Sequence, residues 1–409
     1  MNVLWLSPYA VHPPRHGTAS RISHLGRALR ARHHLTVVSF EADWERNVDP
    51  ETAPFELVSL RWTQRQRSRI HYWTDRFGIL PPRDAATDEN VARLRSLLDR
   101  RAIDVVIAEN VHLAPLLSTI VGLPLVWVEE GIFSTLHHPS RNRRGSVFRR
   151  AQDWIAYLRW RRLEHWAWLR ANALVAVSDR EATEIHERVR GRIPVAVVPN
   201  GVDCDHFAHV HAAFGSPRGV FVGSRWHPNV EALHFFADEV LPRILVKLPE
   251  FRLTVVGDVN DSRRLRPHLA SQIELAGFVG DLRSEFKRSG VFIAPILSGH
   301  GTRIKLLEAM AAGMPIVSTH KGAEGLALTH DDSALLADDA GAFADAVVEL
   351  VRDGERSRRL AAAALRLARE AYDWTNIVAR LEDVLRLAVG QRDVEDGAKP
   401  RAALRGAHR

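Results

Sequence analysis

Residues Ile296–Leu326 read ILSGHGTRIKLLEAMAAGMPIVSTHKGAEGL, and this stretch decides the expected fold of the chain. It starts in an apolar strand end, turns on Gly299 and Gly301, and continues into an amphipathic helix. The helix breaks at Gly313 and leads into a further strand, MPIVST. A strand, a glycine loop, a helix and a second strand in this order form the repeating unit of a doubly wound α/β sheet.

The same stretch predicts a ligand site. A glycine-bounded loop at a helix N-terminus points free backbone N–H groups outward, and such groups bind anions such as phosphate. Thr302 follows Gly301 in the loop, Arg303 and Lys305 add two cations beside it, and Glu308 lies one turn further along the helix. These groups can hold a diphosphate and a ribose together, which favours nucleotide-sugar binding. The alternative is that Lys305 and Glu308 form only an ion pair on the helix surface.

The composition is that of a large globular protein with two domains. A chain of 409 residues with 46% hydrophobic residues exceeds what one compact core accommodates. The single cysteine, Cys204, rules out a disulfide framework within the chain and favours a reducing cytosol. Residues 1–6, MNVLWL, precede a turn signal and are expected to form a first buried strand rather than a signal peptide. No run of about 18 apolar residues occurs, so we expect no membrane span.

Short β-branched runs alternate with helical patterns along most of the chain, and this alternation predicts two doubly wound, Rossmann-like sheets. Most strand candidates are almost entirely apolar, as expected for parallel strands covered on both faces. The predicted strands are Asn2–Leu6, Leu35–Phe40, Ile103–Ala108, Leu123–Val128, Ala173–Val177, Val195–Val198, Gly219–Val222, Arg252–Val256, Ile273–Ala276, Val291–Ala294 and Pro315–Ser318. The predicted helices include Thr18–Arg32, Asn229–Val246, Arg303–Ala312 and a final helix at Asn376–Val389.

A turn cluster marks the expected boundary between the domains. It lies near Pro194–His206 and contains the sequence VPNGVD between two strand signals. We therefore expect one Rossmann-like domain at residues 1–195 and a second at residues 196–372. Residues 391–409 are polar, mixed in charge and without periodicity, which predicts a disordered tail.

The loop after the first strand is a second candidate for ligand contact. Ligands of open α/β sheets bind beyond the carboxyl ends of the strands, and His16, Gly17 and Arg21 follow the first strand closely. The alternative is an ordinary loop between a strand and a helix. No G-x-G-x-x-G follows the first strand, which argues against a dinucleotide dehydrogenase, and no G-x-x-x-x-G-K-[ST] occurs.

Candidate acids and bases lie at the ends of two predicted strands. Glu129 and Glu130 end one of them, and Glu109, Asn110 and His112 follow the other. Site residues gather at strand ends in such a fold, so Glu129, Glu130 and His112 are candidate catalytic residues. The alternative is that these carboxylates lie on exposed loops. No H-E-x-x-H motif and no Cys/His cluster occurs, so we expect no metal site.

The excess positive charge of the chain, +7 in total, is local. Residues Arg141–Arg162 contain eight arginines against one acidic residue, Asp153. Aromatic residues interleave with these arginines or follow them: Trp154, Tyr157, Trp160, Trp166 and Trp168. Three interpretations stay open, namely a solvated basic face, contact with anionic lipid headgroups or a phosphorylated acceptor, and a helix packed between two domains. Nucleic acid is not an expected partner, because no nucleic-acid-binding motif is visible.

Four features together resemble one enzyme family. They are the early glycine loop at Gly17, ALVAVSD followed by VVPNGVD at Val197–Asp203, FVGSRWHPNVEAL at Phe221–Leu233, and GHGTRIKLLEAMAAGMPIVST at Gly299–Thr319. Through them the chain, over about residues 1–390, resembles the retaining, nucleotide-sugar-dependent glycosyltransferases of group 1, also called family 4. The G-x-G-T-R-x-K-x-L-E-A-M motif is similar to that of one branch of this family.

The resemblance implies the GT-B fold, in which two doubly wound Rossmann-like domains face each other across a cleft. The N-terminal domain, residues 1–195, would bind the acceptor, and the C-terminal domain, residues 196–372, would bind the nucleotide sugar. A C-terminal helix over residues 373–390 would cross back to the N-terminal domain.

The resemblance also implies roles for single residues. In the family, the glutamate of the LLEAMA helix binds the ribose hydroxyls, and this role falls on Glu308. The preceding loop gives backbone N–H groups to the diphosphate, here those of Gly301, Thr302 and Arg303. In this family the leaving diphosphate is thought to take the proton of the acceptor during a front-face attack. Such a reaction requires no protein nucleophile.

Further donor contacts follow from two other matched loops. Gly223 and Arg225 belong to the FVGSRW motif on the donor side, and Arg225 is a candidate for the diphosphate. The loop Phe278–Gly280, with Val279 at its centre, is expected to contact the base.

The chain departs from the family pattern at the diphosphate clamp. The Arg-x4-Lys pair of many relatives should fall at Ser224 and Asn229, and both charges are missing. Arg303 and Lys305 stand where many relatives have glycine and proline, so we expect that the cationic clamp has moved onto this helix.

A second departure concerns the donor sugar. His300 stands eight residues before Glu308, where the family pattern has a glutamate that holds sugar hydroxyls, so His300 is a candidate catalytic residue. A histidine that many relatives carry in the N-terminal domain falls near Glu129 and Glu130.

The resemblance predicts transfer of a sugar from a nucleoside diphosphate sugar to a glycan or glycolipid acceptor, with retention at the anomeric carbon, in the assembly of surface polysaccharides or glycoconjugates. The donor is a substrate, and no cofactor or metal is expected. We expect a cytoplasmic protein with peripheral contact to the anionic inner face of a membrane. Two alternatives stay open: a non-catalytic nucleotide-sugar-binding protein and a GT-B sugar-nucleotide epimerase.

Overall fold

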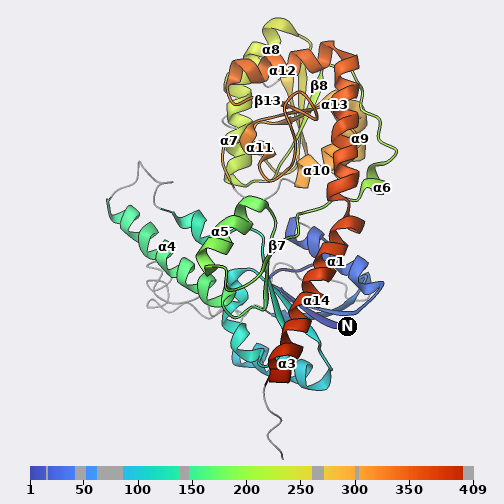
Figure 1. Ribbon diagram of the computed structural model, residues 1–409. Coiled ribbons are helices and arrows are strands. Elements are labelled where there is room, and N and C mark those ends of the chain that lie inside the picture. The colour runs from blue at the N-terminus through green and yellow to red at the C-terminus, as the bar shows by residue number, and fades with distance from the viewer. Residues whose placement is uncertain are drawn as a thin grey trace, which may run out of the picture. The chain divides into compact units, whose positions relative to one another are not determined.

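The computed structural model describes residues 1–14, 17–41, 52–61, 86–138, 147–259, 271–299 and 304–398. The chain divides into two compact units (Figure 1). The N-terminal unit comprises Met1–Val198 and Val378–Arg409, and the C-terminal unit comprises Pro199–Ile377. The division falls inside the turn cluster in which the sequence predicts a domain boundary.

A seven-stranded sheet forms the centre of the N-terminal unit, in the order β3-β2-β1-β4-β5-β6-β7. All neighbouring strands are parallel. The strands are β1 (Asn2–Ser7), β2 (His34–Glu41), β3 (Glu56–Arg61), β4 (Val105–Glu109), β5 (Leu125–Glu129), β6 (Ala173–Ala176) and β7 (Val195–Val197). The central strands β4 and β5 are buried along their whole length, which explains their continuous apolar sequences.

Helices alternate with these strands. They are α1 (Gly17–Arg30), α3 (Asp88–Arg100), α4 (Val147–Trp168) and α5 (Asp179–Val189), together with the 3₁₀ helices η3 (Val111–Thr119) and η4 (Phe133–His137). Side-chain caps explain where two of them begin, because the Thr87 hydroxyl accepts from the N–H of Asn90 and the Ser178 hydroxyl from the N–H of Glu181. The core of the unit includes the fully buried side chains of Trp127 and Trp168.

A six-stranded parallel sheet forms the centre of the C-terminal unit, in the order β10-β9-β8-β11-β12-β13. Its strands are β8 (Arg218–Val222), β9 (Arg252–Val256), β10 (Ile273–Gly277), β11 (Val291–Ala294), β12 (Ile316–Ser318) and β13 (Leu335–Leu336). The fully buried rings of Phe236, Phe251 and Phe343 pack in its core. Both sheets confirm the predicted doubly wound α/β class.

The helices of the C-terminal unit carry one cluster of buried apolar side chains on each side of this sheet. They are α6 (Cys204–Phe207), α7 (His227–Phe235), α8 (Leu241–Lys247), α9 (Arg283–Arg288), α10 (Ile304–Ala311), α11 (His320–Ala323), α12 (Ala340–Arg352) and α13 (Gly354–Leu367), with the π-helical turns η6 (Phe236–Val240) and η9 (Ala368–Tyr372). The last helix, α14, runs from Trp374 to Ala398.

Helix α14 contributes residues to both units, since its residues from Val378 onward belong to the N-terminal unit. There the buried carboxylate of Glu382 lies 2.7 Å from Nη1 of Arg32 and 3.3 Å from Nε2 of His33. The helix extends beyond Val389, where the sequence predicts its end, so residues 391–398 are helical rather than part of an irregular tail. This segment has no apolar period, which is why periodicity missed the extension.

Two strands are absent from the prediction, and both lie at sheet edges. Strand β3 is half-exposed along most of its length, so its sequence, ELVSLR, lacks the continuous apolar run used to find the others. Strand β13 has only two residues and carries no pattern. Within the part of the chain that the structure describes, no helix is both long enough and apolar enough to cross a bilayer.

Candidate functional site

The carboxyl edge of the C-terminal sheet is lined by glycine. Gly223 and Gly257 follow β8 and β9 directly, and Gly277 ends β10. The N–H of Gly257 donates to the carbonyl oxygen of Gly277 at 2.6 Å. Gly257 has a φ of +102°, and a Cβ there would lie 1.9 Å from the carbonyl oxygen of Gly223. Three adjacent strands thus end in backbone without side chains, at the edge where open α/β sheets bind ligands.

Helix α10 places two of the predicted donor residues side by side. Nζ of Lys305 lies 3.2 Å from Oε2 of Glu308, so the surface ion pair considered from the sequence is present. The two partners differ in exposure, since the Lys305 side chain is 49% exposed and that of Glu308 only 19%. Burial raises the pKa of Glu308, and the charge of Lys305 opposes this shift. Apart from this ion pair, Oε2 of Glu308 accepts no hydrogen bond from any described residue, so a further lone pair can accept from a ligand hydroxyl.

His206 is a neighbour of this pair that sequence reasoning missed. It lies on α6, which packs against α10, and its charge affects the pKa of Glu308 and that of Asp281. Hydrogen bonds from Arg283 lower the pKa of Asp281 to about 2, and Nη1 of Arg283 donates to the carbonyl oxygen of His206 at 3.4 Å. The sequence contains a signal for this position, because Asp203 of the VVPNGVD motif caps α6 and so holds His206 in place.

The loop Phe278–Gly280, which is predicted to contact the base, directly precedes Asp281 in sequence and presents an aromatic ring. Phe278 is 89% exposed, although large apolar side chains are usually covered. Val279 is half-buried and packs against the apolar cluster that includes Leu306 and Leu307 of α10. An exposed ring next to a half-buried anchor offers a flat surface for stacking.

The family's clamp positions carry neutral side chains, as the sequence showed. Nδ2 of Asn229 donates to the carbonyl oxygen of Ser224 at 3.0 Å, so the two positions bind each other. Arg225 lies 3.4 Å from Asp258, and both side chains are 67% exposed. An exposed pair of this kind is weak and leaves Arg225 available to a diphosphate.

The remaining donor-side candidates, His300, Gly301, Thr302 and Arg303, lie outside the described residues, as does His16 in the N-terminal unit. Gly299 leads into that stretch with a φ of +105°, a conformation that favours glycine.

A second polar cluster lies at the carboxyl edge of the N-terminal sheet. Helix α1 begins at Gly17, and the hydroxyl of Thr18 in its first turn donates to Oε2 of Glu130. Arg21, one turn later, is 1% exposed, and its Nη2 donates to the carbonyl oxygen of Val198 at 2.8 Å. Nε of Arg21 lies 3.7 Å from Oε1 of Glu130. The sequence-predicted Gly17, Arg21 and Glu130 are therefore brought together.

Glu109 joins this cluster from the end of β4. Its side chain is buried, and burial together with the charge of Glu130 raises its pKa well above the ordinary value, against the charge of Arg21. Burial also raises the pKa of Glu130, whose side chain is 23% exposed. Both carboxyl groups therefore hold a proton to a higher pH than exposed ones. Asn110, which follows Glu109, has a φ of +67°, an uncommon conformation for a residue other than glycine.

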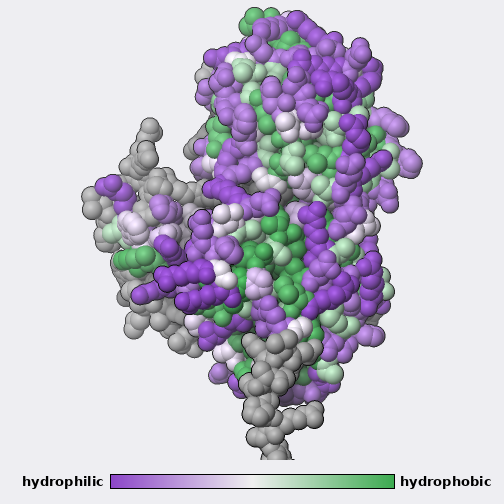
Figure 2. All heavy atoms as spheres, viewed as in Figure 1, coloured by the Kyte–Doolittle hydropathy of each residue, from purple (hydrophilic) through white to green (hydrophobic). Residues whose placement is uncertain are grey.

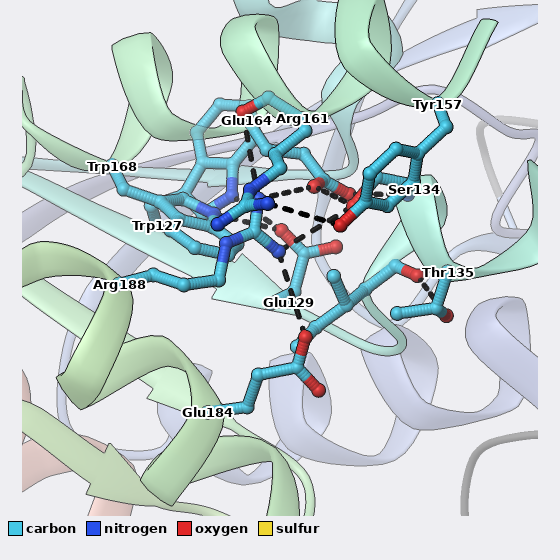
Figure 3. Close-up of polar contacts among 11 residues, drawn as sticks. Trp127, Glu129, Ser134, Thr135, Tyr157, Arg161, Glu164, Trp168, Glu184 and Arg188 are labelled. Atoms are coloured by element: carbon cyan, nitrogen blue, oxygen red, sulfur yellow. Dashed lines mark hydrogen bonds and ion pairs between the residues drawn. The ribbon is translucent and has the colours of Figure 1, made fainter. Parts of the chain in front are cut away.

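Glu129 lies elsewhere, although it is adjacent to Glu130 in sequence. Successive side chains of a strand point to opposite faces, so Glu129 shares the face of Trp127. Its Oε2 accepts from the indole Nε1 atoms of Trp127 and Trp168, at 3.1 and 3.0 Å (Figure 3). Burial, with the nearby Glu164, raises the pKa of Glu129 to about 8. The engagement of its carboxyl group in the core argues against the catalytic role expected from the sequence.

His112 is also separate from the edge cluster. Its ring packs edge to face against the rings of Phe133 and Trp160, with centroid distances of 5.2 and 5.5 Å. Burial lowers the pKa of His112, so the imidazole is neutral near pH 7. This aromatic surrounding is that of a core histidine.

Two family models match the chain, one over most of each unit. Residues 15–206 match the family model of "Glycosyltransferase Family 4", and residues 216–353 match that of "Glycosyl transferases group 1". Both halves of the chain match glycosyltransferase families. The donor-side residues Gly223, Lys305 and Glu308 fall within the second match, and Arg21, Glu109 and Glu130 fall within the first.

Two curated relatives that the chain matches are named as mannosyltransferases. The chain is 29% identical over 232 residues to a phosphatidyl-myo-inositol mannosyltransferase of Mycolicibacterium smegmatis, which covers 50% of this chain and 59% of the relative. It is 28% identical over 217 residues to a GDP-mannose-dependent alpha-(1-6)-phosphatidylinositol monomannoside mannosyltransferase of Mycobacterium tuberculosis, covering 46% of this chain and 55% of the relative. The chain thus spans well under two thirds of the length of these relatives.

Solved structures share the fold over nearly the whole chain. Sucrose-phosphate synthase from Thermosynechococcus elongatus superposes with a TM-score of 0.70 at 15% identity, covering 96% of this chain and 100% of that chain. HepE from Anabaena, in complex with UDP, gives a TM-score of 0.69 at 17% identity, covering 94% and 100%. These similarities establish the fold with two Rossmann-like domains.

Proposed function

We propose that this protein is a retaining glycosyltransferase that moves a sugar from a nucleoside diphosphate sugar to a glycan or glycolipid acceptor. The observation that carries the proposal is Glu308, a largely buried carboxylate beside Lys305 on the helix that follows a glycine loop. This helix lies within the region that matches the group 1 glycosyltransferases. A largely buried carboxylate that pairs with one cation and keeps lone pairs for hydroxyl donors suits a ribose next to a diphosphate.

Each part of the donor has a candidate partner in the C-terminal unit. Glu308 would accept from the ribose hydroxyls, and Lys305 would neutralise the diphosphate. The backbone N–H groups of Gly301, Thr302 and Arg303 would bind the same diphosphate at the helix N-terminus. Arg225 would assist from the opposite loop. Because Gly257 and Gly223 leave the strand ends bare, the ligand can approach the backbone closely.

The base and the sugar would lie at the two ends of this diphosphate site. Phe278 would stack on the base, with Val279 as its anchor. His300 would contact the hydroxyls of the donor sugar in place of the glutamate common in the family. The titratable side chain of His206 is close enough to influence the ribose carboxylate.

Retention requires bond formation on the face from which the leaving group departs. The bond between the anomeric carbon and the diphosphate oxygen breaks, and the acceptor oxygen forms its bond to the same face of that carbon. The acceptor proton passes to the departing diphosphate oxygen. No protein nucleophile takes part. Glu130 and Glu109, which hold protons to a raised pH, would bind acceptor hydroxyls at the N-terminal edge.

The acceptor and the location of the protein form a further part of the proposal. The names of the curated relatives include phosphatidylinositol and its monomannoside, which supports a glycolipid acceptor. A glycolipid lies at the bilayer surface, so we propose peripheral contact with the anionic inner face of a membrane, with Arg141–Arg162 as the basic segment expected from the sequence. The donor serves as the sole small molecule required, without a resident metal or cofactor.

The test is transfer by the pure protein. It is incubated with a panel of UDP- and GDP-sugars plus lipid extract, and products are separated with their anomeric configuration determined. A product with retained configuration supports the proposal, and an inverted product contradicts the retaining mechanism. Donor binding without turnover would identify a non-catalytic binding protein, and an isomerised donor without acceptor an epimerase. Addition of EDTA to the reaction is expected to leave the rate unchanged, and a loss restored by a divalent cation would overturn the metal-free proposal.

A further inference from the structure

A cationic groove lies between α4 and α5 in the N-terminal unit, apart from the edge cluster. It encloses a cavity of about 680 Å³. Five arginines line it, namely Arg161, Arg162, Arg188, Arg190 and Arg192, together with the imidazole of His165. Among the residues that the structure describes, no aspartate or glutamate lines this cavity. We refer to it as the arginine groove.

One arginine of the groove is a structural anchor. Nη2 of Arg188 lies 3.0 Å from Oε2 of the buried Glu164, and its guanidinium lies over the Trp168 ring at 4.3 Å (Figure 3). Glu164 also accepts from the hydroxyl and the N–H of Ser134, at 2.6 and 2.8 Å. This network joins α5 to α4 and neutralises the charge of Arg188, so the anchor supplies the wall of the groove rather than its binding charge.

The other cations lack this compensation. Arg162, Arg190 and Arg192 are exposed, and none of them forms an ion pair with a residue that the structure describes. Their field reaches the neighbouring imidazole, because burial and the positive charges of Arg188 and Arg192 lower the pKa of His165. Like charges this close repel one another, so an anion between them would be bound favourably.

The backbone of Arg190 is a second sign of a site. Arg190 ends α5 in the left-handed conformation, with a φ of +53°, a position that glycine usually occupies. Glycine is the very next residue, Gly191, and it also has a positive φ of +65°. The chain thus holds a cation at a position of the turn where glycine is usually favoured. Such outliers persist where the side chain has a use.

The outer face of α4 continues the groove with apolar side chains. Trp154, Leu158, Arg162 and His165 follow at helical spacing, so they lie on one face of the helix. Trp154 is 48% exposed, Leu158 50% and the neighbouring Ile155 46%. Figure 2 shows apolar side chains over α4 beside strongly hydrophilic ones towards its C-terminal end. Exposed tryptophan and leucine next to arginine are typical of helices that lie in a membrane interface.

We propose that the arginine groove binds the phosphate group of an anionic phospholipid, with Trp154, Ile155 and Leu158 entering the interfacial layer of the bilayer. Guanidinium groups bind phosphate through paired N–H donors, and three exposed arginines converge here without an acidic partner among the described residues. A free phosphate ion would use only the cations and would leave the apolar face in water. A lipid headgroup with its acyl chains matches both parts of the surface.

The inference adds a specific headgroup site to the proposed peripheral contact. Arg188, Arg190 and Arg192 lie outside the segment Arg141–Arg162, on α5 and just after it, so the site extends beyond the segment expected from the sequence. It concerns membrane binding alone, and the experiment below contains no nucleotide sugar. Its result is therefore independent of whether glycosyl transfer is observed.

The experiment is co-sedimentation of the full chain with vesicles of phosphatidylcholine alone and of phosphatidylcholine mixed with phosphatidylglycerol. The test variant carries Arg162→Glu, Arg190→Glu and Arg192→Glu. The matched control carries Arg27→Glu, Arg95→Glu and Arg380→Glu, which change three exposed arginines of the same unit on α1, α3 and α14 by the same charge. We expect parent and control to bind the anionic vesicles and the test variant to bind them at least about tenfold more weakly.

Three outcomes would overturn the site. The first is parent binding that is equal on neutral and anionic vesicles or absent from both. The second is an equal loss of binding in the control and in the test variant, which would show that only total charge matters. The third is full competition by inorganic phosphate at constant ionic strength, which would assign the groove to a free anion. If the triple variant is unfolded by circular dichroism, Arg162→Glu with Arg192→Glu replaces it, since neither residue has the left-handed backbone of Arg190.

The apolar half of the surface is tested separately. Trp154→Ala with Leu158→Ala is expected to weaken binding at least about threefold in 1 M salt, where the Debye length falls to about 3 Å and little electrostatic attraction survives. A matched change at the exposed Leu275 and Val246 of the C-terminal unit should leave binding unchanged. Equal binding by the parent and the Trp154/Leu158 variant would show that the helix does not enter the bilayer. Binding to poly-glutamate as strong as to anionic vesicles would instead indicate an acidic protein partner.

Discussion

The carboxyl edges of the two sheets present chemically different surfaces to a ligand. In the C-terminal unit, Gly223, Gly257 and Gly277 remove side chains from three adjacent strand ends, and charges stand on helices around the bare backbone. In the N-terminal unit, the buried side chains of Arg21 and Glu109 fill the corresponding edge with polar groups. Bare backbone suits a phosphate, which binds N–H groups at close range. Buried carboxyl groups suit hydroxyls, which donate and accept hydrogen bonds.

The largest expected effect tests whether the bare edge is required. Gly257→Ala would place a Cβ 1.9 Å from the carbonyl oxygen of Gly223, at a φ of +102° that alanine rarely adopts. We expect the free energy of unfolding to fall by at least about 3 kcal/mol, measured by urea denaturation. Gly280→Ala is the matched control, because a Cβ there meets nothing within 4 Å and its φ is not in the left-handed region. A loss below about 1 kcal/mol at Gly257 would show that the close approach relaxes without cost.

A pH-dependent effect on stability distinguishes the core carboxyl group from those at the edge. The pKa of Glu129 is raised to about 8 in the folded protein, so the fold favours its protonated form. Its stabilising contribution is complete below the unfolded pKa near 4.5 and is lost as the pH rises towards 8. Over that window the parent should lose up to about 1.4 kcal/mol per pH unit relative to Glu129→Gln, whose amide does not ionise. Urea denaturation of both proteins at pH 5.5 and 7.5 measures this difference, and parallel pH profiles would contradict the buried position of Glu129.

Donor affinity tests the role of the charges around the bare edge. Lys305→Glu would oppose a diphosphate, and Glu308→Ala would remove the ribose acceptor. We expect each change to raise the dissociation constant of UDP or GDP at least about tenfold, or about 1.4 kcal/mol, by calorimetry. Arg303→Ala should act in the same way. Lys287→Glu, an exposed position on α9, is the charge-matched control. Parent-like affinity in all three variants would refute the donor site.

The smallest expected effect tests whether the N-terminal edge acts on the acceptor rather than on the donor. Glu130→Gln keeps an oxygen for the hydroxyl of Thr18 but removes the ionisable group beside Arg21. We expect a several-fold lower rate of transfer to the acceptor, with an unchanged dissociation constant for the donor. Saturation kinetics with each substrate varied in turn gives both quantities. A change confined to donor binding would mean that the N-terminal edge serves the donor and not the acceptor.

The strands and candidate site residues differ in whether the sequence pattern alone could predict them. Strands β4 and β5 are found from sequence because both of their faces are buried, and this condition produces an apolar run. The edge strands β3 and β13 are missed because that condition fails at a sheet edge. Lys305 and Glu308 were found because a loop, a helix and a charge pair adjoin in sequence. His206 reaches Glu308 only through the packing of α6 on α10, across about a hundred residues of chain.

The sequence by itself determined the doubly wound class and the helix that carries the candidate donor residues, because both depend on local order along the chain. Only the tertiary structure decided which of the neighbours Glu129 and Glu130 faces the site, since the alternation of a strand sends them to opposite sides. It also decided that arginines of α4 and α5 converge on one groove. Distances between residues far apart in sequence depend on the packing of whole elements, which local propensities do not encode.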